Sequence, residues 1–162
     1  MKRILISIIL IVLMLLSSCR VFISNDLRAD ARMEQIISAI KGNDKVALKT
    51  LFSKKALDEA VDIDSEIDFL FDFIQGDIVS WERDGWASDG KIDHGKRFLM
   101  IRFRINIKTD KEEYRFFVMD YNMDTINPDN EGMYMLEVCR ASYEGIYLGW
   151  QERMRGGIDI RE

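Results

Sequence analysis

The chain has 162 residues and carries 28 acidic against 23 basic side chains, which gives a formal net charge of −5. This length suits one domain with its own core and is too short for two ordinary domains. The acidic balance argues against nucleic acid as a partner, because phosphate binding draws on a basic surface.

The N-terminal segment has the layout of a secretory signal peptide. Lys2 and Arg3 form a positive start, and residues 4–16 are an apolar run that only Ser7 interrupts. A bilayer-spanning helix needs about 20 apolar residues, so this run is too short to stay as a membrane span. The sequence Leu16-Ser17-Ser18-Cys19 resembles the lipobox of bacterial lipoproteins. The resemblance implies cleavage before Cys19 and a diacylglyceryl group on its thiol, often with a further acyl chain such as palmitate. The alternative is an ordinary secretory signal with an incidental cysteine.

The lipobox also predicts where the mature chain lies. Residues 1–18 are removed, residues 19–25 form a lipid-anchored tether, and residues 26–162 form a single domain. Two or three acyl chains anchor a protein stably, so we expect the chain on the cell membrane or the outer membrane, facing the extracytoplasmic side. Loss of Lys2 and Arg3 leaves a net charge of −7. Cys139 is then the sole free thiol, so no intrachain disulfide is expected, and its strand-like surroundings favour burial over catalysis.

Helical periodicity occupies the first half of the domain. A first helix begins near Asp26 as N-cap and ends with Gly42 in the C′ position, and Asn43 or Asp44 starts a second. Ser53 begins a short further turn, and the clearest helix runs from Asp62 towards Gly76. The apolar faces contain Leu27, Ala31, Met33, Ile36, Ile37 and Ile40 in the first helix, Ala47, Leu48, Leu51 and Phe52 in the second, and Ile63, Ile67, Leu70, Phe71 and Ile74 in the last.

From Asp77 the hydrophobic period changes to two. It predicts strands at about 77–87, 97–108, 113–123 and 132–142. Helices followed by strands are typical of an α+β fold, so we expect N-terminal helices packed on a curved antiparallel sheet of at least four strands.

Three stretches carry a resemblance to known families. The stretch Ala39-Ile40-Lys41-Gly42-Asn43-Asp44, continued by residues 47–53, is similar to the opening helices of the nuclear-transport-factor-two-like (cystatin-like, ketosteroid-isomerase-like) superfamily. With the lipobox, the turn at residues 127–132 and the ending Gly156-Gly157-Ile158-Asp159-Ile160 resemble an uncharacterised family of bacterial lipoproteins with a domain of unknown function. The resemblance implies a cone-shaped sheet with a pocket under the helices, and it assigns no activity.

Sheet register predicts the candidate site. If residues 109–112 form a tight turn, then facing residues of the second and third strands have numbers that sum to 221. The pairs are Lys108/Glu113, Ile107/Tyr114, Ile105/Phe116, Phe103/Val118, Ile101/Asp120 and Leu99/Asn122. One face is therefore apolar until Asp120 and Asn122, an arrangement typical of a small-ligand pocket. We predict that Asp120, Asn122, Ile101, Phe103 and Trp81 bind the ligand. The alternatives are a solvated sheet end or swapped faces.

The opposite face ends in an apolar patch of Phe98, Met100, Tyr121 and Met123. It is interpreted either as a homodimer or partner contact or as a surface that residues 143–160 cover. Regular alternation would send Trp81 and Trp86 to opposite faces of the sheet, because they lie five residues apart.

Familiar catalytic motifs are absent from the sequence. His94, the single histidine, lies in a hairpin-like loop and has no second histidine for a common zinc set, so neither a metal nor a cofactor is expected. The sequence therefore favours a non-enzymatic envelope lipoprotein that binds a small apolar ligand or an envelope protein. The alternative is an acid-base enzyme of ketosteroid-isomerase-like type, with Asp120 as the base and Tyr121 or Asn122 beside it.

Overall fold

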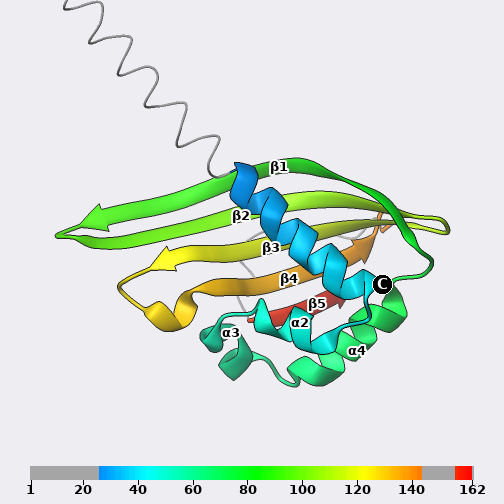
Figure 1. Cartoon of the computed structure of the whole chain (residues 1–162), viewed down its shortest axis with the longest axis horizontal. Helices are drawn as coiled ribbons and strands as arrows, with labels where there is room; N and C mark the ends of the chain where they lie inside the picture. Colours follow the sequence, from blue (N-terminus) through cyan, green and yellow to red (C-terminus); the bar gives the residue numbers. More distant parts are fainter. Residues whose placement is uncertain (1–25, 144–155, 162) are drawn as a thin grey trace, which may run out of the picture.

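The computed structural model describes residues 26–143 and 156–161. Figure 1 shows helices gathered on one face of a five-stranded sheet, so the predicted α+β class is confirmed. The predicted signal peptide, the predicted tether, Cys19 and most of the segment 143–160 lie outside the described residues.

The helices begin where the sequence provides a capping side chain. The N-terminal helix (residues 26–41) is followed by α2 (Lys45–Thr50), α3 (Lys54–Glu59) and α4 (Ile63–Phe73). The side chains of Asp44, Ser53 and Asp62 each accept a hydrogen bond from the backbone amide three residues later, at 2.9, 3.1 and 3.2 Å. Each of these bonds satisfies an otherwise unpaired donor in the first helical turn. Of the two residues considered for the start of the second helix, Asn43 and Asp44, it is Asp44 that caps it, and the predicted starts at Ser53 and Asp62 are confirmed.

The first helix ends differently from the prediction. Asn43, not Gly42, takes the left-handed conformation, with φ of 48°. The Gly42 amide still donates to the carbonyl of Ser38 at 2.9 Å, so the helical hydrogen-bond pattern continues through the glycine. The chain reverses one residue later, where asparagine tolerates positive φ better than most residues do.

The sheet is an antiparallel meander with one parallel strand added. Its order is β1 (Ile78–Asp93), β2 (Lys96–Thr109), β3 (Glu113–Asp124), β4 (Gly132–Arg140) and β5 (Gly157–Arg161), with the short helix η1 (Pro128–Asn130) before β4. β5 pairs in parallel with β4 and was not predicted. β1 extends six residues beyond the predicted strand, because pairing with β2 overrides the loop-like composition of Ser88-Asp89-Gly90.

A bulge in β1 places both tryptophans on the same face. Between the pairs Arg83↔Ile105 and Trp86↔Phe103, β1 contains one more residue than β2. Gly85 lies in this bulge with φ of +113°, a conformation that glycine adopts without strain. Trp81 and Trp86 consequently both pack against the core, and the prediction of opposite faces was wrong.

The core fills the space between the helices and the sheet. In Figure 1 the N-terminal helix crosses the sheet from β1 towards α4. The inward side chains of the central strands are almost completely buried, and they meet the inward faces of the N-terminal helix and α4: Ile101, Phe103, Ile105, Val118, Met33, Ile36, Ile67 and Leu70. Each contributes about 1.5 to 3 kcal/mol by leaving water. None of the helices in the described ranges is long and apolar enough to cross a membrane.

Candidate functional site

The predicted register between β2 and β3 holds over most of its length. Five of the six predicted pairs are present in the structure. They are Lys108/Glu113, Ile107/Tyr114, Ile105/Phe116, Phe103/Val118 and Ile101/Asp120. The turn is closed by Thr109, whose amide donates to the carbonyl of Glu112 at 2.9 Å. Asp120 therefore lies on the helix side of the sheet, and it is 2% exposed.

Asp120 has a charged partner that the strand pattern did not reveal. Arg32 reaches it from the N-terminal helix, and the distance from Arg32 Nη2 to Asp120 Oδ1 is 3.0 Å. The helical spacing contained a clue, since Arg32 follows Ala29 by three residues and precedes Ile36 by four, and both of these are buried. A basic residue in such an apolar stripe needs a partner inside the fold.

Burial and charge act in opposite directions on Asp120. Burial raises the pKa of its carboxyl group, and the neighbouring guanidinium of Arg32 lowers it, with burial the larger of the two. The result is a pKa above the usual range for aspartate. A carboxylate with a raised pKa is a stronger base than an ordinary aspartate, provided that a substrate can reach it.

Asn122 does not face Leu99, because β3 contains an additional residue at this point. The pairs Met100↔Tyr121 and Leu99↔Met123 leave Asn122 in a bulge. The predicted pair Leu99/Asn122 was wrong for this reason. The same bulge places Met123 opposite Leu99 on the helix side, so Met123 does not belong to the predicted outer patch. The Asn122 side chain is half-buried, and its Oδ1 atom has no hydrogen-bond partner among the described residues.

Tyr121 lies on the outer face, away from Asp120. Its ring packs edge-on against Phe98 and Tyr134, with centroids 5.6 and 6.0 Å away. The Tyr134 hydroxyl donates to Glu59 Oε2 at 2.5 Å. Burial, followed by the charges of Asp124 and Glu59, raises the pKa of Tyr121. Because neighbouring strand residues face opposite sides, Asp120 and Tyr121 do not form one acid-base site.

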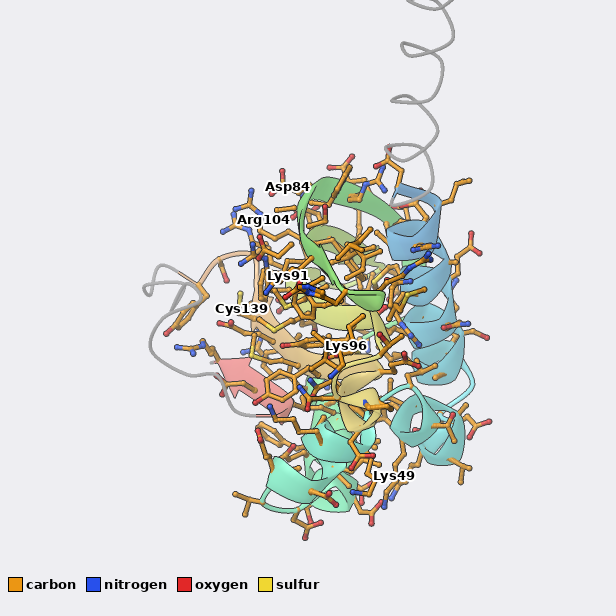
Figure 2. The ribbon with its side chains drawn as sticks, turned by 90° about the vertical axis from the view of Figure 1, so that its left-hand side faces the viewer. Lys49, Asp84, Lys91, Lys96, Arg104 and Cys139 are labelled. Atoms are coloured by element: carbon orange, nitrogen blue, oxygen red, sulfur yellow. The ribbon has the colours of Figure 1, made fainter. Side chains whose placement is uncertain are left out.

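A cavity of about 620 Å³ lies on the other side of the sheet from the helices. Its lining comes from β1, β2, β3 and the end of β4: Ser80, Trp81, Glu82, Asp84, Arg104, Asn106, Ile107, Lys108, Glu113, Tyr114, Arg115 and Ala141. Figure 2 shows Asp84 and Arg104 on the side of the sheet remote from the N-terminal helix. Of the predicted ligand-binding residues, Trp81 borders this cavity although it also packs against the core on the helix side, whereas Asp120, Asn122, Ile101 and Phe103 are not part of the lining.

The loop between β3 and β4 is organised by Asp124. Its Oδ1 atom accepts from the amides of Ile126 and Asn127 at 3.0 and 2.9 Å, and its Oδ2 atom accepts from Asn130 Nδ2 at 2.7 Å. Burial raises the pKa of Asp124, but these hydrogen bonds outweigh it and lower the pKa overall. Asp124 is thus a structural carboxylate, and the strand pattern gave no indication of it.

His94 occupies the tip of the hairpin between β1 and β2. Its φ is 47°, and its side chain is 95% exposed. Within residues 26–143 and 156–161, no three histidine, cysteine, aspartate or glutamate side chains are grouped so that they could hold a metal ion.

The fold and its sites define an α+β domain with a buried ion pair on one face of the sheet and a charged cavity on the other. Residues 35–141 match the family model described as "Domain of unknown function (DUF5104)". The chain belongs to this family. No curated protein matches the chain.

Proposed function

We propose that this chain is a cell-envelope lipoprotein, held on a membrane by lipid on Cys19, whose domain binds a ligand or an envelope partner without catalysing a reaction. The sequence Leu16-Ser17-Ser18-Cys19 after an apolar run supports the anchor. The mature domain then lies on the extracytoplasmic side of the cell membrane or the outer membrane.

The burial of Asp120 is the main observation in favour of a binding role without catalysis. Asp120, the candidate base, is buried under the helices and is neutralised by Arg32 at 3.0 Å. A general base must come within hydrogen-bond reach of the proton that it removes. The charged cavity lies on the opposite face of the sheet, so the accessible polar groups and the candidate base are separated. Binding through the accessible groups is the function that this arrangement supports best.

The raised pKa of Asp120 favours the second candidate, an acid-base enzyme of ketosteroid-isomerase-like type. This alternative requires that a substrate displace Arg32 and reach the carboxyl group. Structural ion pairs shift pKa values by the same physics, so we rank this candidate second.

The anchor is tested by changing each cysteine separately in a bacterium that is fed labelled palmitate. Cys19→Ser should abolish incorporation of the label, because only the thiol accepts the diacylglyceryl group. Cys139→Ala is the matched control, since Cys139 is 2% exposed within β4, and it should leave labelling unchanged. If the Cys19→Ser protein still takes up label, the lipoprotein proposal is wrong.

A further inference from the structure

The outer-face cavity has an ordered pattern of charge. Its polar lining is arranged in three rows. Strand pairing forms the first, Ser80, Lys108 and Glu113, and the second, Glu82, Asn106 and Arg115, both of which cross β1, β2 and β3. Paired residues on neighbouring strands lie on the same face, so the members of these two rows are direct neighbours. The third row is the ion pair of Asp84 and Arg104 at the β1 bulge.

The two flanking rows satisfy their charges internally. In the first, Lys108 Nζ lies 3.3 Å from Glu113 Oε1. In the third, Arg104 Nε lies 3.8 Å from Asp84 Oδ2, and Arg104 also donates to the Asp84 carbonyl oxygen at 3.4 Å. Both pairs are exposed, so they contribute little to stability. They do reduce the attraction of these four side chains for an external ion.

The middle row differs, because its two charged side chains have no partners among the described residues. Glu82 and Arg115 are both exposed, and neither side chain makes an ion pair or a hydrogen bond with any other residue that the structure describes. Asn106 lies between them on β2 and is half-buried. The row therefore presents a free carboxylate, a neutral amide and a free guanidinium in a line.

The spacing of this row sets the length of a complementary ligand. Glu82 and Arg115 are two strands apart, which is about 9.6 Å at the usual separation of neighbouring strands. An extended peptide of three residues spans about 10 Å. Its terminal ammonium group can meet Glu82 while its terminal carboxylate meets Arg115, whose planar guanidinium can bind a carboxylate through two hydrogen bonds. The Asn106 amide can hydrogen-bond a peptide group between them.

We propose that the outer-face cavity is a binding site for short zwitterionic peptides, held by Glu82 at the ammonium end and by Arg115 at the carboxylate end. This inference rests on the proposed binding role of the domain and names its ligand class. It does not depend on Asp120, which lies on the other face of the sheet.

Equilibrium dialysis of labelled trialanine against the full chain in detergent tests the proposal. Arg115→Gln and Glu82→Gln should each weaken binding about tenfold or more, because each removes a charge-assisted hydrogen bond. Arg97→Gln and Glu34→Gln are matched controls, since both side chains are exposed and lie outside the cavity lining, and they should leave affinity unchanged. N-acetyl-trialanine amide, which lacks both charges, should not compete.

The binding results and the lipidation of Cys19 are tested independently of each other. If trialanine does not bind, or if the blocked peptide competes equally, the zwitterionic site is wrong even when Cys19 is lipidated. Pentaalanine spans about 17 Å and cannot place both ends in one row, so it should bind more weakly than trialanine. Equal binding of the two lengths would also overturn the proposed geometry.

Discussion

The buried pair of Asp120 and Arg32 makes a quantitative prediction about pH and stability. Replacing Arg32 by Met keeps an apolar stem but removes the charge that faces a carboxyl group of 3% side-chain exposure. The folded protein must then hold an unpaired buried carboxylate or bind a proton there. Protonating a carboxyl group whose ordinary pKa is about 3.9 costs about 4 kcal/mol at pH 7 and about 1.5 kcal/mol at pH 5. These values are upper limits for the loss in free energy of unfolding, because protonation is always open to the folded chain.

The direction of this pH dependence follows from the linkage between protonation of Asp120 and folding. Without Arg32 the pKa of Asp120 in the folded state rises further above its unfolded value, so the penalty is absent at low pH. It grows as pH rises from the unfolded pKa towards the folded one, by about 1.4 kcal/mol per pH unit. Arg32→Met should therefore lose up to about 4 kcal/mol of stability relative to the parent at pH 7, but only up to about 1.5 kcal/mol at pH 5. Adding Asp120→Asn should restore most of the loss at pH 7, because no buried charge remains.

Urea unfolding of residues 26–162, followed by tryptophan fluorescence at pH 5, 6 and 7, measures these differences. Arg28→Met is the control, since Arg28 is exposed on the same helix, and it should change the free energy of unfolding by less than about 0.5 kcal/mol. An Arg32→Met loss that is equal at pH 5 and pH 7, or a double variant no more stable than the single one, would refute the reasoning.

Two further predictions concern the loop at Asp124 and the cysteine Cys139. Asp124→Ala should lower the free energy of unfolding by about 1 to 3 kcal/mol at pH 7, because the donors of Ile126, Asn127 and Asn130 lose their acceptor. Its lowered folded pKa means that this stabilisation is lost as pH falls, so urea unfolding near pH 3 should show a smaller difference between parent and variant, and an equal difference would contradict the assignment. Residues 26–162 should melt at the same temperature with and without dithiothreitol, because Cys139 is their single cysteine; a large drop on reduction would indicate an intermolecular disulfide.

The sequence predicted the register of β2 and β3 because local chemistry determines it. The turn at residues 109–112 is closed by Thr109, whose Oγ1 accepts from the Glu112 amide at 2.8 Å. Alternating apolar residues on both sides then allow one pairing. The same reasoning failed at Asn122 and Gly85, since a bulge adds one residue to a strand without a distinctive change in composition. Beyond such a bulge, each side chain points to the face opposite to the one that regular alternation predicts.

The buried ion pair and the outer-face cavity differed in how well the sequence could predict them. Arg32 could have been suspected as the partner of Asp120, because a basic residue interrupts an apolar helical stripe. Which carboxylate it meets depends on how the helix crosses the sheet. The row of Glu82, Asn106 and Arg115 was not recognisable as a whole, although the predicted register places Asn106 opposite Arg115. The pairing of β1 with β2, which adds Glu82 to the row, was not predicted.

Mass spectrometry of the N-terminal peptide of the membrane-extracted protein determines whether the chain is anchored by lipid on Cys19. We expect a mature chain that begins at Cys19 and carries the added mass of a diacylglyceryl group, with or without a further acyl chain on its amine. A chain that starts at another residue, or an unmodified Cys19, would show that the protein is not a lipoprotein anchored at this cysteine.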